Sequence, residues 1–353
     1  MAWSSIRGHD GVIERFRQSL ETGRMSHAYL FVGPPGIGKE LFTRELAKAL
    51  LCAQDTGEAC GLCPACHKVE HGNHPDVTFV RRIERTSKGA RKTQIVIDQM
   101  REEIQEPIAY KPFEGRFKVF VVAEAERMTE EAQNCLLKTL EEPPPHSLLI
   151  LLAARLEPFV DTVVSRCQIV RFRPLPPALV EEILIDGHQM EPERARLLAR
   201  LSEGSPGQAL RHEAQGTHET AVWLLDSLRS MRGQGAEFIV ASELYDRARD
   251  QGSTLEDTRD HLRPLLDLLA LAWRDVLFRA SGFADEMLTW GTDCQALEAL
   301  ASTLSAARAR RLTELFAEAR DHLDANANIK LLLENLLLNV GALLHGGAPI
   351  GAR

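Results

Sequence analysis

A short glycine-rich segment carries most of a phosphate-binding motif. The segment that begins at Gly33 reads Gly-Pro-Pro-Gly-Ile-Gly-Lys-Glu, whereas a P-loop requires Gly-x-x-x-x-Gly-Lys followed by Ser or Thr. Gly33, Gly38 and Lys39 match this pattern, and Gly36 gives the loop further room for a phosphate. The last position is Glu40, so a carboxylate replaces the hydroxyl that would bind Mg²⁺. The motif therefore predicts a nucleotide-binding loop that has lost one magnesium ligand.

The second half of such a site is an acidic residue at the end of another strand, where it orients Mg²⁺. Here the apolar run that starts at Phe117 ends in Ala123, followed by Glu124. Alanine stands where the magnesium-orienting Asp is expected, whereas the acidic residue that would activate water is present at Glu124. Two unit charges about 4 Å apart repel by about 4 kcal/mol in a partly shielded site, so Glu40 also opposes phosphate binding. The pair predicts absent or weak ATP hydrolysis and leaves passive nucleotide binding open.

A cluster of cysteines forms the second candidate site. Cys52, Cys60, Cys63 and Cys66 lie within fifteen residues, with the spacing Cys-x₇-Cys-x₂-Cys-x₂-Cys. Four thiolates so close together favour a structural Zn²⁺ site, tetrahedral and without an open position for catalysis. Unliganded thiols and an iron–sulfur cluster are the alternatives. The bacterial ferredoxin run would need its fourth cysteine at Glu70, so the pattern favours zinc.

The composition bounds the class of protein. The chain has 353 residues, 44% of them hydrophobic and 26% charged, as in soluble globular proteins of two or three domains. We expect a cytoplasmic protein, because neither a signal-peptide layout nor a membrane-spanning apolar run is evident. The net charge of −8 argues against strong nonspecific DNA binding by the whole surface. A basic run from Arg81 to Lys92 is either a solvated loop or a local nucleic-acid contact.

Strand and helix signals alternate in the first 175 residues. The apolar run Ala28–Val32 predicts a buried strand that leads into the glycine-rich loop, and apolar residues at helical spacing follow from Lys39 to Leu51. Further strands are expected at Phe117–Ala123 and Leu148–Ala153, with a helix at Thr129–Leu140 between them. This alternation predicts an α/β domain with a parallel sheet.

The remainder of the chain has helical periodicity. A proline-rich linker from Arg173 to Pro177 precedes it, and strongly apolar helices are expected at Leu262–Phe278 and Ile329–Leu344. The predicted division is an α/β domain at 1–175 with a zinc module at 52–66, a small helical domain at 176–215, an all-helical domain at 216–345, and a disordered tail at 346–353.

Several segments together resemble the AAA+ clamp-loader family of bacterial DNA polymerase III. The segments are His27–Phe31, Leu136–Pro144 with the sequence Leu-Leu-Lys-Thr-Leu-Glu-Glu-Pro-Pro, and Ser165–Cys167 with the sequence Ser-Arg-Cys. The four-cysteine insertion also resembles the zinc module of this family. The resemblance covers residues 1–210 well and the rest more weakly, through Trp273–Asp275 and Asn326–Asn328. It implies a P-loop α/β domain, a small helical lid domain and an all-α collar domain for oligomerisation.

The resemblance also implies roles. Gamma or tau motor subunits have an intact loop and an Asp-Glu pair on the second strand, whereas the nucleotide site of delta-prime subunits is usually defective. Glu40 and Ala123 depart from the motor pattern, so the chain resembles the delta-prime branch. Arg166 is then implied to be an arginine finger for a neighbouring motor subunit's ATP, with a surface salt bridge as the alternative. The implied partners are gamma or tau, the delta subunit, the sliding clamp and primer-template DNA, without a membrane.

Three functions stay open at this point. The favoured one is an ATPase-silent clamp-loader subunit of the polymerase holoenzyme, with structural Zn²⁺, that supplies Arg166 and helps load the clamp. The second is an active clamp-loader ATPase that binds Mg-ATP through Glu40 and turns over ATP in isolation. The third is a zinc-dependent DNA-binding protein with a vestigial P-loop, whose DNA binding would be sensitive to salt and lost with the metal.

Overall fold

The chain divides into two compact units, which are described separately. A computed structural model describes residues 2–54, 56–82, 94–231, 235–250, 254–284, 287–290 and 295–345. The first unit comprises Met1–His188 and Glu203–Gln208, and the second comprises Gln189–Ser202 and Ala209–Arg353. The predicted tail at 346–353 and the part of the basic run beyond Arg82 lie outside the described residues.

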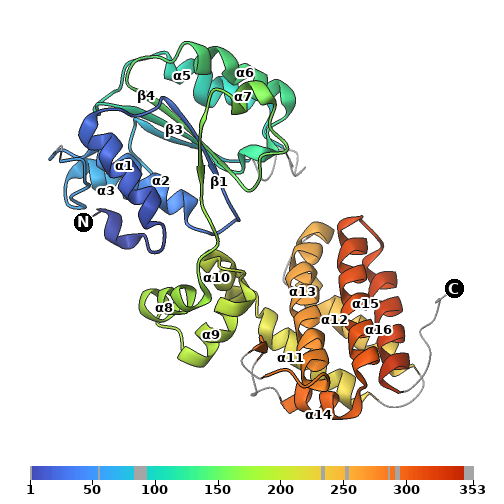
Figure 1. Ribbon diagram of the computed structural model, residues 1–353. Coiled ribbons are helices and arrows are strands. Elements are labelled where there is room, and N and C mark those ends of the chain that lie inside the picture. The colour runs from blue at the N-terminus through green and yellow to red at the C-terminus, as the bar shows by residue number, and fades with distance from the viewer. Residues whose placement is uncertain are drawn as a thin grey trace. The chain divides into compact units, whose positions relative to one another are not determined.

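A five-stranded parallel sheet forms the centre of the first unit (Figure 1). Its strand order is β2-β3-β4-β1-β5, and all four pairings are parallel. The strands are β1 (Ala28–Val32), β2 (Val77–Val80), β3 (Lys118–Val122), β4 (Ser147–Ala153) and β5 (Gln168–Arg171). The predicted α/β fold with a parallel sheet is therefore confirmed. The sequence did not predict β2 and β5, which are the two edge strands.

Side chains of β1 point alternately to the two faces of the sheet, and helices pack on both faces. Leu30 belongs to a buried cluster that also contains Leu136 of α6 (Glu130–Glu141). The opposite face carries Phe31, whose ring contacts Phe16 of α1 (Asp10–Thr22) and Phe42 of α2 (Lys39–Leu51) at centroid distances of 5.7 Å. Successive side chains of a strand point to opposite faces, so a short apolar strand can bury helices on both sides.

Further α-helices complete the described part of the first unit. They are α3 (Pro64–Glu70), α4 (Ile97–Met100), α5 (Glu106–Ile108), α7 (Asp161–Val164) and α8 (Pro177–His188). The N-terminus of α6 is capped as the sequence predicts, because the Thr129 hydroxyl accepts a hydrogen bond from the backbone N–H of Ala132. This cap fixes the start of the helix whose other end carries Glu141.

The second unit is helical in all its described regular elements. Its helices are α9 (Pro192–Leu201), α10 (Pro206–Ala214, whose first residues belong to the first unit), α11 (Thr217–Ser230), α12 (Ala236–Asp250), α13 (Leu255–Ala280), α14 (Gln295–Thr303), α15 (Ala306–Asp324) and α16 (Ile329–Leu344). Trp273 and Phe316 stack in its core at a centroid distance of 6.2 Å. None of the helices in the described residues is long and apolar enough to cross a membrane.

Candidate functional site

The glycine-rich loop lies between the end of β1 and the start of α2, as the sequence predicts. Gly38 is the N-cap residue of α2, with φ of 106°, and Gly36 has φ of 76°, conformations that favour glycine. The ammonium group of Lys39 donates to the carbonyl oxygens of Gly33 and Pro34. Burial lowers the pKa of Lys39 to about 8, with Glu126 opposing the shift. The lysine that normally reaches a phosphate is therefore engaged with its own loop.

A second segment of the first unit closes against the loop. The backbone N–H of Gly207 donates to the Gly36 carbonyl at 3.0 Å, and the Ser205 hydroxyl donates to the Pro35 carbonyl at 2.7 Å. A Cβ atom on Gly207 would lie 2.7 Å from the Cα atom of Gly36, closer than real contacts allow. Two glycines thus let the two backbones touch, and the loop keeps its shape through bonds within the protein.

Arginines pair with both carboxylates of the nucleotide-site motifs, Glu40 and Glu124. Glu40 accepts from Nη2 of Arg81 at 2.5 Å and from Nη2 of Arg44 at 3.3 Å. Ala123, directly after β3, offers no side-chain oxygen. Glu124 pairs with Nε of Arg127 at 3.0 Å and with Nε of Arg82 at 3.7 Å. Because each carboxylate already has arginine partners, the charge that it offers to a divalent cation is partly neutralised.

Sequence reasoning missed the partners of these carboxylates. The basic run that contains Arg81 and Arg82 predicts only a solvated loop or a nucleic-acid contact. The structure instead places both residues directly after β2, which pairs with β3. Since the carboxyl ends of neighbouring parallel strands share one edge of the sheet, this pairing brings the two arginines to Glu40 and Glu124. The signal was the basic pair itself, which could be interpreted only once β2 was known.

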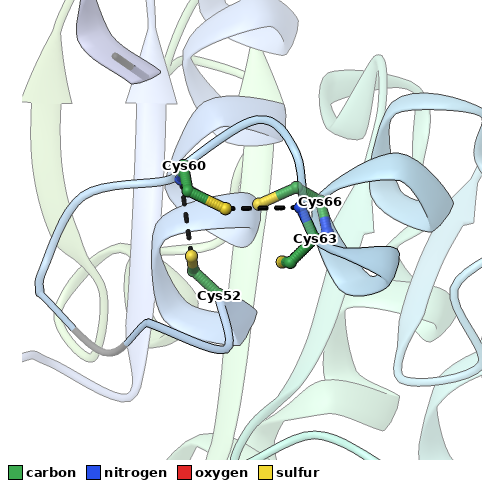
Figure 2. A group of neighbouring side chains, drawn as sticks. All are labelled: Cys52, Cys60, Cys63 and Cys66. Atoms are coloured by element: carbon green, nitrogen blue, oxygen red, sulfur yellow. Dashed lines mark hydrogen bonds between the residues drawn. The ribbon is translucent and has the colours of Figure 1, made fainter.

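The four predicted cysteines converge in space (Figure 2). Cys52 follows the last residue of α2, Cys63 is the N-cap residue of α3 and Cys66 lies in its first turn. The four Sγ atoms lie within 4.8 Å of one another. Tetrahedral zinc needs four sulfur atoms at about 2.3 Å from the metal, so this grouping fits a closed metal site.

The cysteines of the cluster differ in pKa: backbone N–H groups favour the thiolate of Cys60, whereas burial raises the pKa of the Cys66 thiol to about 12. The N–H groups of Leu62 and Cys63 both donate to Sγ of Cys60, at 3.4 and 3.3 Å, and lower the pKa of the Cys60 thiol. Gly61 permits the tight turn, with φ of 70°. Thiolate is the form that binds a metal, so metal binding at this cluster would release the proton of Cys66.

A buried aspartate anchors the chain that leaves the cysteine module. The Asp76 carboxylate accepts from the backbone N–H groups of Phe113, Glu114 and Gly115 at 2.5, 2.9 and 2.7 Å. Burial by itself raises its pKa, but these three donors outweigh burial and lower the pKa below the usual value. Asp76 therefore holds the 113–115 turn next to the end of α2.

Replacing Asp76 by Asn is expected to lower the free energy of unfolding by about 1–3 kcal/mol at pH 7, because strong bonds to a carboxylate are lost. Since the folded-state pKa is depressed, this stabilisation is present above the unfolded pKa of about 4 and disappears as pH falls through the folded value. Urea unfolding between pH 7 and pH 3 measures it. Asp98→Asn, at a side chain 88% exposed, is the control. Equal pH dependence of wild type and Asp76→Asn would contradict the assignment.

Arg166 follows α7, with its side chain 36% exposed. Its Nη1 donates to the Thr162 carbonyl at 3.0 Å and to the Ser165 hydroxyl at 3.4 Å, and its Nη2 lies 2.8 Å from Oε1 of Glu141. Within the described structure its polar partners come from α6 and from α7 with the residue after it, and none comes from the glycine-rich loop. Cys167 is buried, and burial raises the pKa of its thiol to about 12, in keeping with a packing role.

In sequence, this chain resembles known subunits of DNA polymerase III. Residues 8–176 match the family model described as DNA polymerase III, delta subunit. DNA polymerase III subunit delta' of Bacillus subtilis is 31% identical over 332 residues, covering 93% of this chain and 94% of that protein. DNA polymerase III subunit tau of Escherichia coli is 34% identical over 214 residues, which are 59% of this chain and 32% of the relative.

Among solved structures, a DNA polymerase III gamma-subunit-related protein from Thermotoga maritima aligns with 94% of this chain and 99% of its own, at 18% identity and a TM-score of 0.43. The match to the delta' protein is different in kind, because it joins 31% identity to near-complete coverage of both chains. This chain therefore belongs to the delta-prime family of DNA polymerase III clamp-loader subunits.

Proposed function

We propose that this chain is an ATPase-silent clamp-loader subunit that supplies Arg166 to the ATP site of a neighbouring motor subunit. In this role it helps to load the sliding clamp onto primed DNA during replication. The observation that supports the absence of ATPase activity concerns Glu40. This residue replaces the magnesium-binding hydroxyl, and its carboxylate accepts hydrogen bonds from Arg81 and Arg44. Ala123 removes the second metal contact. Both magnesium ligands are missing from the amino-acid sequence, so a rearrangement of side chains at Glu40 and Ala123 cannot restore them.

The finger role rests on the exposure and chemistry of Arg166. A guanidinium group inserted in trans neutralises the charge that develops on a γ-phosphate. Arg166 is 36% exposed and its contacts are surface contacts, which a triphosphate could replace because exposed ion pairs are weak. Within this chain, Arg166 forms a salt bridge with Glu141. In the assembly, we propose that it also contacts the triphosphate bound to a neighbouring motor subunit.

The proposal extends to the rest of the chain. Residues 176–215 would form the lid domain and residues 216–345 a collar domain that joins gamma or tau and delta in a cytoplasmic hetero-oligomer. The Cys52–Cys66 module would hold one structural Zn²⁺. Clamp and primer-template DNA would be contacted through the complex.

Lys39→Ala is expected to leave the clamp- and DNA-stimulated ATPase of the reconstituted complex within about twofold of wild type, because Lys39 serves only its own loop. The readout is steady-state ATP turnover, compared with the equivalent lysine substitution in the motor subunit, which should abolish turnover at that subunit's own site. The isolated chain should show no ATP turnover and no zinc-dependent DNA binding. Loss of turnover with Lys39→Ala, together with full activity of Arg166→Ala, would overturn the proposal.

A further inference from the structure

The guanidinium group of Arg166 is held on its own chain by contacts from two helices. Helix α6 ends at Glu141, whose Oε1 atom lies 2.8 Å from Nη2. Nη1 turns back to the carbonyl of Thr162, four residues earlier, and to the hydroxyl of Ser165. The side chain is therefore retracted onto α7 and the end of α6.

The contacts of Arg166 within its own chain compete with a contact to a neighbouring subunit. A guanidinium has five N–H groups in a rigid fork, and it binds phosphate best through two of them in parallel. Both terminal nitrogens of Arg166 are already bonded, Nη1 to α7 and the following residue and Nη2 to α6. Three of the five N–H groups are used in this way, so a phosphate that binds through the Nη2 edge must compete with Glu141 for that nitrogen.

We propose that Glu141 is a positioning residue that keeps Arg166 retracted until the assembly presents a triphosphate. The inference rests on the proposed function, since it concerns how the finger is released. The pair suits a weak latch, because its side chains are 52% and 36% exposed. An ion pair so exposed favours the closed arrangement by at most about fivefold, whereas a phosphate in a dry site binds a guanidinium more strongly. In the resting complex, without DNA and clamp, the ion pair then lowers the fraction of complexes in which Arg166 is free to contact the triphosphate. In the stimulated complex, with DNA and clamp bound, the contact with the triphosphate replaces the ion pair.

The next residue along the chain offers a matched control. Glu142 is also exposed and carries the same charge, but it is the C-cap residue of α6, where its backbone N–H donates to the Lys138 carbonyl. The ion pair of Arg166 is made with Glu141. A general effect of surface charge on assembly would appear with both residues, whereas an effect through the finger would appear with Glu141 alone.

The test compares Glu141→Gln and Glu142→Gln in the complex reconstituted from full-length subunits, in which the other motor subunits carry inactive P-loops. Glutamine keeps the shape and removes the charge. Without DNA and clamp, Glu141→Gln should raise ATP turnover at the adjoining motor site by about two- to fivefold, a rise limited by the inverse of the open fraction. The stimulated rate should change by less than about 1.5-fold, because the latch is then already open. Glu142→Gln should match wild type, and thermal unfolding should confirm that each variant folds.

A double variant separates a latch from a structural effect. In Arg166→Ala the further change Glu141→Gln should have no effect, since the group it holds is absent. If Arg166→Ala leaves stimulated turnover intact, the proposed function itself fails. If Arg166→Ala lowers it but Glu141→Gln leaves the resting rate unchanged or reduces it, only the latch is overturned. A rise that persists in the double variant also overturns the latch.

Discussion

Replacing Arg166 by Ala is expected to slow ATP hydrolysis at the adjoining motor site by about 10³-fold or more, the range seen when an arginine finger is removed. Guanidinium charge placed at the γ-phosphate stabilises the transition state, and alanine offers nothing in its place. The clearest measurement is single-turnover hydrolysis in a complex whose other motor subunits carry inactive P-loops. In an unmodified complex, the total rate would fall only by the share of that one site.

Lysine at the same position sharpens this test. Arg166→Lys keeps the positive charge but loses the planar fork, so an intermediate rate is expected. Arg171, an exposed residue of β5 in the same unit, provides a control for general loss of positive charge through Arg171→Ala. Wild-type hydrolysis by the Arg166→Ala complex would remove the finger from the proposed function.

Removal of the metal is expected to produce the largest change in stability. The purified chain should contain one zinc ion, and binding at a free concentration a thousand times the dissociation constant adds about 4 kcal/mol to folding. A chelator, or Cys66→Ser, should therefore lower the unfolding temperature of the first unit by several degrees. Acidification should release the ion as well, because thiolates must bind protons when they leave the metal.

Metal analysis together with thermal unfolding measures this effect. Cys135→Ser is the matched control, because Cys135 is a free thiol outside the four-cysteine cluster. The structural zinc assignment would be wrong if the chain contained iron, or if Cys66→Ser kept both the bound metal and the wild-type unfolding temperature.

The parts of the fold that the sequence predicts are those with strong local signals. Strand β1 is buried at all five positions, and the apolar run of the sequence shows it. Helix α6 has its Thr129 cap, and α16 begins and ends where the apolar pattern does. Edge strands give no such signal. Strand β5 has only four residues and leaves Gln168 and Arg171 exposed, so its sequence looks like that of a loop.

The site was predictable where its chemistry depends on residues close in sequence. The cysteine spacing and the departures at Glu40 and Ala123 are visible in the chain. The ion pairs are not visible in the sequence, because they join segments that lie far apart in it. Arg81 and Glu40 are 41 residues apart, and Arg166, which follows α7, pairs with Glu141 at the end of α6. Many arginines could pair with many acids, and only strand order and helix packing select among them.

Helix α2 connects the glycine-rich loop to the cysteine cluster, and its order does not depend on a bound nucleotide. Its thirteen residues begin beside Gly38 and end beside Cys52, and so span about 20 Å between the glycine-rich loop and the cysteines. Hydrogen bonds within the chain hold the loop at the first end, and the four cysteines gather at the other, so neither end uses a nucleotide. Under the proposed function, helix α2 would therefore keep the same conformation before and after each round of ATP hydrolysis by a neighbouring subunit. The neighbour's conformational change would then act against a helix whose order does not depend on the nucleotide cycle.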